Sequence, residues 1–397
     1  MAIVSIIAPT PSVILSGNPM FYQVTTNTTL TSILRLNATI LARANVSDSW
    51  ETITTLQLTY SPFNSTTVFD IRSIVSSLLD VSELPAPSTD WVNSVHSKQI
   101  KLSLFETNLG SETPLEDASE TTPFWCIKGI TDFIKASDAS NYNYQEAFTA
   151  KFLTEMPKTR DAYFSQPFCV SFANLSLAGT AVTYILRVFI FWENGEDDLI
   201  QETIELDFGK IKTFVCDDSL FDIPAGPPQR VKKVQVKLFS DADVKLDALT
   251  FNYREAPAKR SRHFIWLNNL GGYDFLTCTG LLEQKLKSEG TIIATTVYQN
   301  DYTSQQADNL EVNFRSDTSY KINTGMLTRA EVDAFLHFFA SPQSFLFAKN
   351  GLENTDFWYL PVAKKLSASY RKDRNYENAV SFEFQTLFNP KTSFPIN

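Results

Sequence analysis

Histidine and glycine are both scarce in this chain, and the shortage excludes several classes of enzyme. The 397 residues include 3 His and 13 Gly. Histidine is the most common general base near neutral pH, yet no HExxH, GxSxG or catalytic-cysteine sequence surrounds His96, His263 or His337. We expect structural or surface roles for these histidines and predict that the chain is not an enzyme.

The sequence also lacks two kinds of binding motif. One is the glycine-rich loop that binds phosphate, and the other is the cysteine pair that binds metal. Neither GxxxxGK[ST] nor GxGxxG occurs in the sequence, so the usual signatures of nucleotide binding are absent. The four cysteines stand far apart, without a CxxC pair or a nearby histidine; they are Cys126, Cys169, Cys216 and Cys278. We expect buried reduced thiols, no metal and no cofactor.

Basic charge is in the minority. The net charge is −10 and the sequence pI is about 5.0, which disfavours direct contact with the phosphate backbone of nucleic acid. The one basic cluster, residues 259–262, follows Pro257 and indicates a solvated linker. Two acidic clusters, at residues 193–198 and 241–247, do not match the EF-hand pattern and indicate solvated loops rather than calcium sites.

Long apolar runs are absent too. The longest apolar stretch, residues 181–192, contains Arg187 and is shorter than the roughly 20 residues that a membrane-spanning helix needs. Pro9 and Pro11 interrupt the opening apolar stretch, which does not resemble a signal peptide. We expect no membrane insertion and no secretion.

The residues that are present favour a folded, mainly β chain. Hydrophobic residues make up 43% of the sequence, and 31 residues are Phe, which is enough apolar material for packed cores. Apolar and polar residues alternate with period two around residues 34–40, 56–60 and 100–104, as in half-buried strands. Asp70 precedes a short stretch with helical spacing of apolar residues. Residues 1–118 are therefore predicted to form a β-sandwich with one short helix.

The second predicted domain, residues 119–256, contains the clearest local pattern. Alternating stretches at residues 182–192 and 199–208 flank Asn194-Gly195, the dipeptide that favours a tight primed turn. The alternation predicts a hairpin, and further strand patterns at residues 231–238 complete a second β-sandwich. The domain is expected to end near the linker at Pro257.

Residues 257–397 are predicted to form a compact mixed β/α domain with one capped helix. Strands are expected near residues 291–298 and 311–315. Thr328 and Glu331 form a capping-box sequence, followed by a helical stripe that ends at Ser341-Pro342; the stripe comprises Val332, Phe335, Leu336 and Phe339. A final strand is expected around Phe382.

One strand-to-turn segment concentrates residue types that bind ligands. A possible interface or binding loop in this segment comprises Trp266, Asn268, Asn269, Gly271, Gly272 and Asp274. The favoured alternative is a tight hairpin in which the glycines supply positive φ and the Asn and Asp side chains bond their own backbone.

This segment also carries a resemblance to a known family. Together with several short motifs in the same order, it is similar to tail or baseplate proteins of phages and prophages of Bacteroidetes-type bacteria. The motifs are Phe275-Leu276-Thr277-Cys278-Thr279-Gly280, Ser16-Gly17-Asn18-Pro19, Phe69-Asp70-Ile71, Lys128-Gly129, and Phe152-Leu153-Thr154 with Pro157.

The resemblance implies a virion structural protein with a distal-tail-like role, made in the cytoplasm of the bacterial host. Such a subunit would form a ring with copies of itself and contact tail-tube or fibre proteins. An alternative is a glycan-binding tail adhesin that presents Trp91, Trp125 or Trp358 to sugar. A hydrolase that uses only carboxylates is a third hypothesis, although no particular Asp or Glu pair stands out in the sequence.

Overall fold

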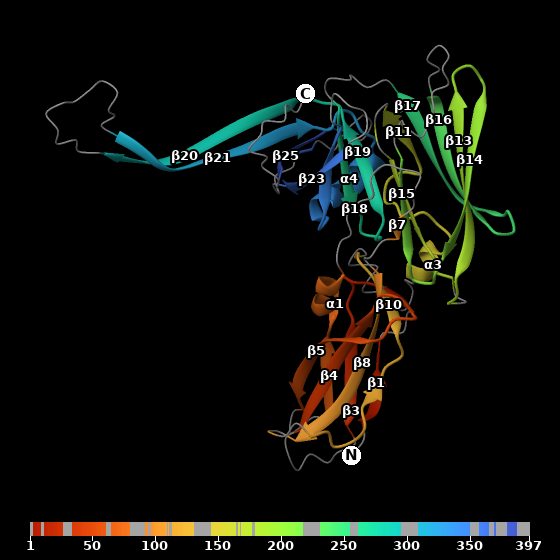
Figure 1. Cartoon of the computed structure of the whole chain (residues 1–397), viewed down its shortest axis with the longest axis vertical. Helices are drawn as coiled ribbons and strands as arrows, with labels where there is room; N and C mark the ends of the chain where they lie inside the picture. The colour runs from red at the N-terminus through yellow and green to blue at the C-terminus, as the bar shows by residue number, and fades with distance from the viewer. Residues whose placement is uncertain are drawn as a thin grey trace. The chain divides into compact units, whose positions relative to one another are not determined.

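The fold of the chain is mainly β, as the sequence predicts. The structure, a computed structural model, describes residues 3–8, 12–26, 34–60, 65–79, 92–93, 97–108, 110, 113–130, 144–163, 166, 168–176, 179–216, 231–254, 261–294, 309–349, 357–364, 369–370 and 379–386. These residues form five sheets and three helices (Figure 1).

The chain divides into two compact units. Unit 1 comprises Met1–Arg254, Ile265–Phe275 and Ala340–Pro342, and unit 2 comprises Glu255–Phe264, Leu276–Phe339 and Gln343–Asn397. Two of the three predicted domains, residues 1–118 and 119–256, therefore fall almost entirely in unit 1. The finer layout of two sandwiches and a β/α domain stays a prediction.

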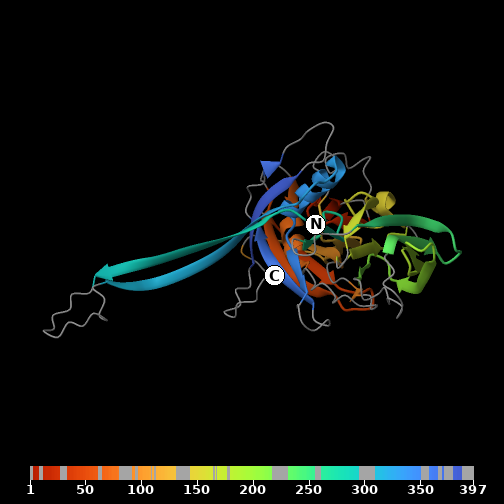
Figure 2. The ribbon, with the colours of Figure 1, turned by 90° about the horizontal axis from the view of Figure 1, so that it is seen from above.

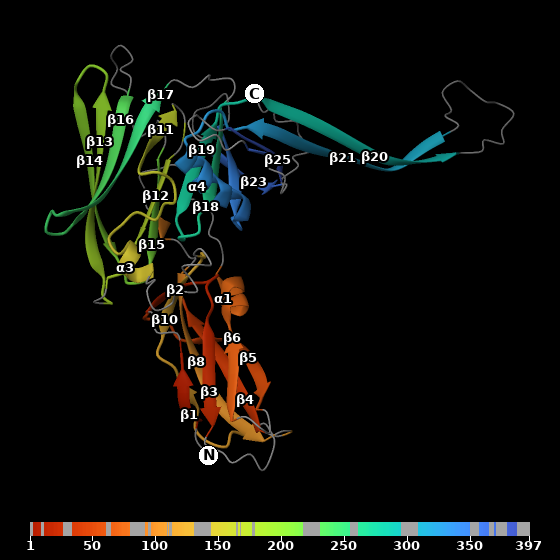
Figure 3. The same ribbon diagram turned by 180° about the vertical axis from the view of Figure 1, so that it is seen from behind.

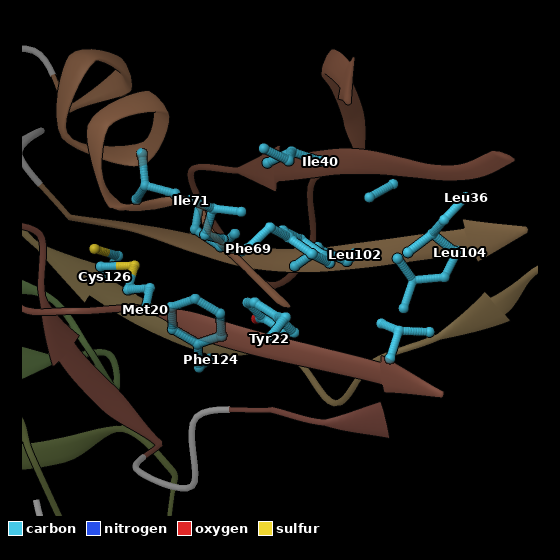
Figure 4. Packing of buried hydrophobic residues seen from close by; sticks show 14 of the residues in the cluster. Met20, Tyr22, Leu36, Ile40, Phe69, Ile71, Leu102, Leu104, Phe124 and Cys126 are labelled. Atoms are coloured by element: carbon cyan, nitrogen blue, oxygen red, sulfur yellow. The ribbon is translucent and has the colours of Figure 1, made fainter. Parts of the chain in front are cut away.

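The N-terminal part of unit 1 has two sheets around one core. The smaller sheet has the order β1 (Ile3–Ile7), β3 (Phe21–Thr26), β6 (Thr66–Asp70). The larger has the order β2 (Val13–Leu15), β10 (Phe124–Ile127), β8 (Ser97–Asn108), β4 (Leu34–Arg43), β5 (Glu51–Thr59), with β9 (Ser119–Glu120) beside β8. Figure 4 shows side chains from both sheets, among them Tyr22, Leu36 and Leu102, in the shared core.

Helix α1 (Arg72–Leu78) packs on the same core. The sequence predicts that Asp70 caps this helix, but the N-cap position is Ile71, one residue later, and it makes no side-chain cap bond. Asp70 Oδ1 still accepts hydrogen bonds from the backbone nitrogens of Arg72, at 2.9 Å, and Met20, at 3.1 Å. Val75 is the fully buried residue of the helix. The bonds from Asp70 satisfy a backbone donor at the helix start, which would otherwise lack a partner.

The rest of unit 1 contains the predicted hairpin. A five-stranded sheet has the order β11 (Thr159–Tyr163), β17 (Lys245–Arg254), β16 (Val231–Ser240), β13 (Val182–Trp192), β14 (Asp197–Leu206). A three-stranded sheet has the order β12 (Phe168–Ala173), β15 (Ile211–Cys216), β7 (Val92–Asn93), and helix α3 spans Tyr144–Phe148. The predicted β13–β14 hairpin is confirmed, and Gly195 at its turn has a φ of +91°. The predicted primed turn at Asn194-Gly195 is wrong: the Gly195 nitrogen donates to the Trp192 carbonyl oxygen, so Glu193 and Asn194 are the central residues, and Asn194 does not have the positive φ that a primed turn needs there.

The eight-stranded sheet holds most of the strands of unit 2. Its order is β19 (Tyr273–Cys278), β18 (Arg262–Leu267), β22 (Ser344–Lys349), β23 (Phe357–Lys364), β25 (Val380–Thr386), β21 (Asn309–Asn323), β20 (Leu282–Ala294), with β24 (Ser369–Tyr370) beside β25. The expected strands at residues 291–298 and 311–315 are only parts of β20 and β21, and residues 295–298 lie outside the described ones.

Helix α4 (Arg329–Ala340) begins at the predicted capping box. The backbone nitrogen of Thr328 donates to Glu331 Oε2 at 2.8 Å, and that of Glu331 donates to Thr328 Oγ1 at 3.3 Å. The predicted stripe needs correction: Phe338 is fully buried, whereas Leu336 and Phe339 are half-buried. Phe338 therefore belongs to the stripe that packs on the sheet; its ring centroid is 5.5 Å from that of Phe382, and the Phe339 ring is 5.6 Å from the same residue.

Candidate functional site

The six residues of the predicted binding loop lie in unit 1, in and beside the turn between β18 and β19. Trp266 is fully buried, and only 2% of Asn268 and 1% of Asp274 is exposed. Both glycines are buried, and Asn269 is half-buried. The predicted loop is therefore an internal turn.

Asn268 organises this turn through all the polar atoms of its side chain. Its Oδ1 accepts hydrogen bonds from the backbone nitrogens of Leu270, at 3.0 Å, and Gly272, at 2.9 Å. Its Nδ2 donates to the Leu153 carbonyl oxygen at 2.8 Å and to Asp274 Oδ2 at 2.9 Å. The side chain bonds its own backbone, as expected, and in addition joins the turn to a segment more than a hundred residues earlier.

Asp274 is a buried carboxylate with several partners. Its Oδ2 accepts from the backbone nitrogen of Glu155 at 3.0 Å, and the hydroxyl of Thr154 donates to its Oδ1. Arg160 Nη1 lies 3.9 Å from Oδ1, and both side chains are almost completely removed from water. Burial raises the pKa of Asp274, and the positive charge of Arg160, followed by the hydrogen bonds, opposes that rise.

The guanidinium group of Arg160 lies between two aromatic rings. Its central carbon is 4.3 Å from the ring centroid of Phe275 and 5.2 Å from that of Phe251. Stacking on aromatic faces compensates for part of the lost hydration of a buried cation. The Arg160–Asp274 pair is consequently a cross-link inside unit 1.

The glycines are required by close approach. A Cβ atom added to Gly272 would lie 2.2 Å from the Leu153 carbonyl oxygen. Gly271 has a φ of +85°, and a Cβ there would lie 2.5 Å from Ile127 Cγ2. Positive φ was expected at both glycines, but only Gly271 has it. Gly272 is needed for contact with a neighbouring backbone instead.

Further bonds tie the turn to Ile130, Tyr144 and Glu155. Asn269 donates to Glu155 from its backbone nitrogen and from Nδ2, each at 3.2 Å, and its carbonyl oxygen accepts from the nitrogen of Ile130 at 2.9 Å. Tyr144 donates its hydroxyl to the Leu270 carbonyl oxygen at 2.7 Å. This geometry favours an internal support for unit 1, and an interface role for these residues stays a prediction.

The other candidate groups have ordinary structural surroundings. His263 Nδ1 lies 2.8 Å from Thr277 Oγ1, and desolvation, aided by the charge of Arg262, lowers the pKa of His263 to about 3. His337 lies in α4, and His96 is outside the described residues. Cys126, Cys169 and Cys278 are buried thiols, as predicted. Cys216 ends strand β15, and its side chain is outside the described ones.

The acidic clusters differ from each other. Residues 193–198 are exposed, as predicted, but Asp247 is only 7% exposed and accepts a hydrogen bond from the Phe152 nitrogen at 3.0 Å. The solvated-loop prediction is thus wrong for Asp247, which pairs with Lys158. Within the ranges described above, no group of three or more His, Cys, Asp or Glu residues could hold a metal ion.

Within the described residues, the structure does not place the tryptophans expected to contact glycan on one shared surface. Trp125 is 2% exposed and belongs to a core cluster, so that expectation is wrong for Trp125. Trp358 is described only as a backbone position of β23, and Trp91 lies outside the described residues.

Sequence patterns did not reveal the length of the β20–β21 hairpin. The register runs from Leu282, opposite Ile322, to Ala294, opposite Asn309. β21 pairs with β25 only from Tyr320 to Asn323. Beyond those pairs, the described residues of β20 and β21 pair only with each other. Figures 1 and 3 show the two strands running side by side beyond β25, and Figure 2 shows them from another side in teal and blue.

This two-stranded ribbon, residues 286–294 and 309–318, has two unpaired edges in its described part. Strand edges present unsatisfied N–H and C=O groups that can pair with another chain. Gly290, at the register shift between Glu289 and Thr291, was the available sequence signal for a long, bulged strand.

Comparisons with known proteins add no assignment. No protein-family model and no curated protein matches the chain. Similar solved structures include CBD12 from CALX1.2, with 9% identity over 60% of this chain and 82% of that chain, and a TM-score of 0.19. The calcium binding domain CBD12 of CALX1.1 has 8% identity, covers 63% of this chain and 100% of that chain, and has a TM-score of 0.20. Neither likeness bears on fold or function.

Proposed function

We propose that the chain is a structural subunit of a bacteriophage tail or baseplate, which self-associates into a ring and contacts tail-tube or fibre proteins. The observation that carries the proposal is the two-stranded ribbon of β20 and β21. An isolated two-stranded hairpin is only marginally stable in water, because it buries little apolar surface. A ribbon of this length gains stability when a further chain pairs with its edges or covers a face.

Other features support assembly rather than catalysis. The polar cluster around Asn268 and Asp274 is buried inside unit 1, where it joins segments of the chain to each other. The motif resemblance specifies which assembly we propose, a phage tail. In the described part of the chain, no helix combines the length and apolar composition that crossing a membrane requires.

The ribbon can be removed at a defined register position. Leu286 and Thr318 are directly opposite each other, so replacing residues 287–317 by Asn-Gly would close a short hairpin at that point. We expect the intact purified chain to form rings in negative-stain electron microscopy and multimers in light scattering. The shortened variant should remain folded, with a circular dichroism spectrum changed only by the loss of the ribbon's strands, and should lose the rings.

A location test completes the experiment. Antibody against the chain should label tails of phage particles that carry it. A chain that is monomeric in solution and absent from the tails would refute the proposal. Rings that persist in the shortened variant would show that the ribbon does not form the contact between copies.

A further inference from the structure

The five-stranded sheet of unit 1 has a second face that is only half-covered. Along β13, Tyr184, Leu186, Val188, Ile190 and Trp192 are buried, and the alternate positions are half-buried. These half-buried residues include Ile185, Arg187, Phe189 and Phe191. A stripe of aromatic and aliphatic residues, interrupted by Arg187, therefore lies along the middle of the face that is turned away from the core.

On one side of this stripe, β16 carries basic residues. Lys233 Nζ lies 4.2 Å from the ring centroid of Phe191, and Lys237 Nζ lies 4.1 Å from that of Phe189. The alkyl stems of lysines can cover apolar surface while the charged ends remain in water. This side of the face is thus apolar beneath and positively charged above.

On the other side of the stripe, β14 is the edge strand and is acidic. Asp197 and Glu205 are exposed, and Leu199 between them is 53% exposed. The register places Asp197 directly opposite Phe191, and Phe191 lies opposite Lys233 on the other side. Asp197 and Lys233 are consequently at the same level along β13, on opposite sides of it.

This arrangement is self-complementary. A two-fold axis parallel to β13 exchanges the two sides of the strand, so it places β16 of one copy over β14 of a second copy. Lys233 then meets the second copy's Asp197 twice by symmetry, and the two stripes face each other with the lysine side chains that lie over Phe189 and Phe191 between them. The charge of Arg187, also near the axis, is compensated by Asp243 at 2.6 Å.

We propose that this face is a paired contact between two copies of the chain. The inference rests on the proposed function in that it requires copies to be brought together in an assembly. The ribbon would supply the repeating contact of a ring, and this face would join copies in pairs, for instance between two rings. A second copy fits better than an anionic polymer, because Asp197 and Glu205 would repel a polymer that Lys233 and Lys237 attract.

Charge reversal tests the pairing. Lys233→Asp and Asp197→Lys would each place like charges together twice in every pair, whereas a mixture of the two variants would restore both attractions. The measurement is the pair dissociation constant from sedimentation, in the background of the shortened ribbon so that ring formation does not interfere. We expect each variant alone to associate roughly tenfold or more weakly than the parent, and the mixture to recover the parent value.

Lys98→Asp is the matched control, since Lys98 is a half-buried lysine on a strand of another sheet of unit 1. It should leave the pairing unchanged. Unchanged pairing in Lys233→Asp, or a mixture that does not recover, would overturn the inference while leaving the ring proposal intact. Retention on dextran sulfate that depends on Lys233, without pairing, would also overturn it. Loss of rings on shortening the ribbon is a separate outcome that concerns only the proposed function.

Discussion

Two hairpin turns of unit 1 use the same residue types in opposite surroundings. In the β13–β14 turn, Asn194 Oδ1 accepts a hydrogen bond from the backbone nitrogen of Glu196 at 3.0 Å; in the β18–β19 turn, Asn268 Oδ1 accepts from that of Leu270 at 3.0 Å. The local bond is the same. A Cβ added to Gly195 would meet nothing within 4 Å, whereas one added to Gly272 would meet the backbone of Leu153 at 2.2 Å.

The difference shows how one local motif can serve two purposes. The exposed turn only reverses the chain, and its energetic contribution is limited to the backbone conformation it stabilises. The buried turn also satisfies distant backbone groups and holds a buried ion pair. Substitutions should therefore have very different costs at equivalent positions of the two turns.

The largest difference is expected when the buried carboxylate is removed. Asp274→Ala would leave Arg160 without its counter-charge and the Glu155 nitrogen without its acceptor, and should lower the free energy of unfolding by about 3–5 kcal/mol. Glu193→Ala, in the exposed turn, should change it by less than about 0.5 kcal/mol. Urea denaturation followed by circular dichroism measures both, and equal effects would contradict the comparison.

Gly272→Ala should have the next largest effect. The added methyl group would meet a backbone oxygen, which can move only if the chain around Leu153 shifts. We expect a loss of about 3 kcal/mol in unfolding free energy. Gly17→Ala is a useful comparison, because its new methyl group would also be crowded, by Ile130 Cβ at 2.6 Å and the Gly129 carbonyl oxygen at 3.0 Å, and should likewise require a backbone shift.

Acid should lower the stability of unit 2, because His263 lies there. The β13–β14 hairpin contains no histidine and should not show this effect. The folded pKa of His263 is about 3, below its value of 6.5 in an unfolded chain, so the unfolded state binds the proton first. Stability from this group is present above pH 6.5 and is lost as the pH falls toward 3. Between pH 7.5 and 5, the loss should be up to about 2 kcal/mol.

The test for His263 compares the wild type with His263→Gln, which can still bond Thr277. The difference in unfolding free energy between the two proteins should shrink as the pH falls. Parallel curves over this range would show that the imidazole is not held in its neutral form.

Gly195→Ala should have the smallest effect. The position has space for a methyl group, but its φ of +91° is disfavoured for alanine. We expect a loss of about 1 kcal/mol, from backbone strain alone. A thermal melt should therefore shift by only a few degrees, and a loss comparable to that of Gly272→Ala would remove the distinction between the two turns.

Local patterns in the sequence determined much of the secondary structure. The β13–β14 hairpin, the Thr328–Glu331 capping box and the alternation of Phe382 and Phe384 in β25 depend on neighbours a few residues apart, and the structure confirms them. The mainly β fold follows from such alternation along many strands. The phage-tail assignment depends on motif resemblance and stays a prediction.

Only the tertiary structure decided how deep each segment lies. Asn268 and Asp274 have the composition of a ligand-binding loop, but contacts with Leu153, Glu155 and Arg160 make them internal. The opposite placement of Lys233 and Asp197 beside Phe191 likewise depends on the register of three strands. Pairing between residues far apart in the chain sets both features, because local periodicity specifies which residues share a face but not what covers that face.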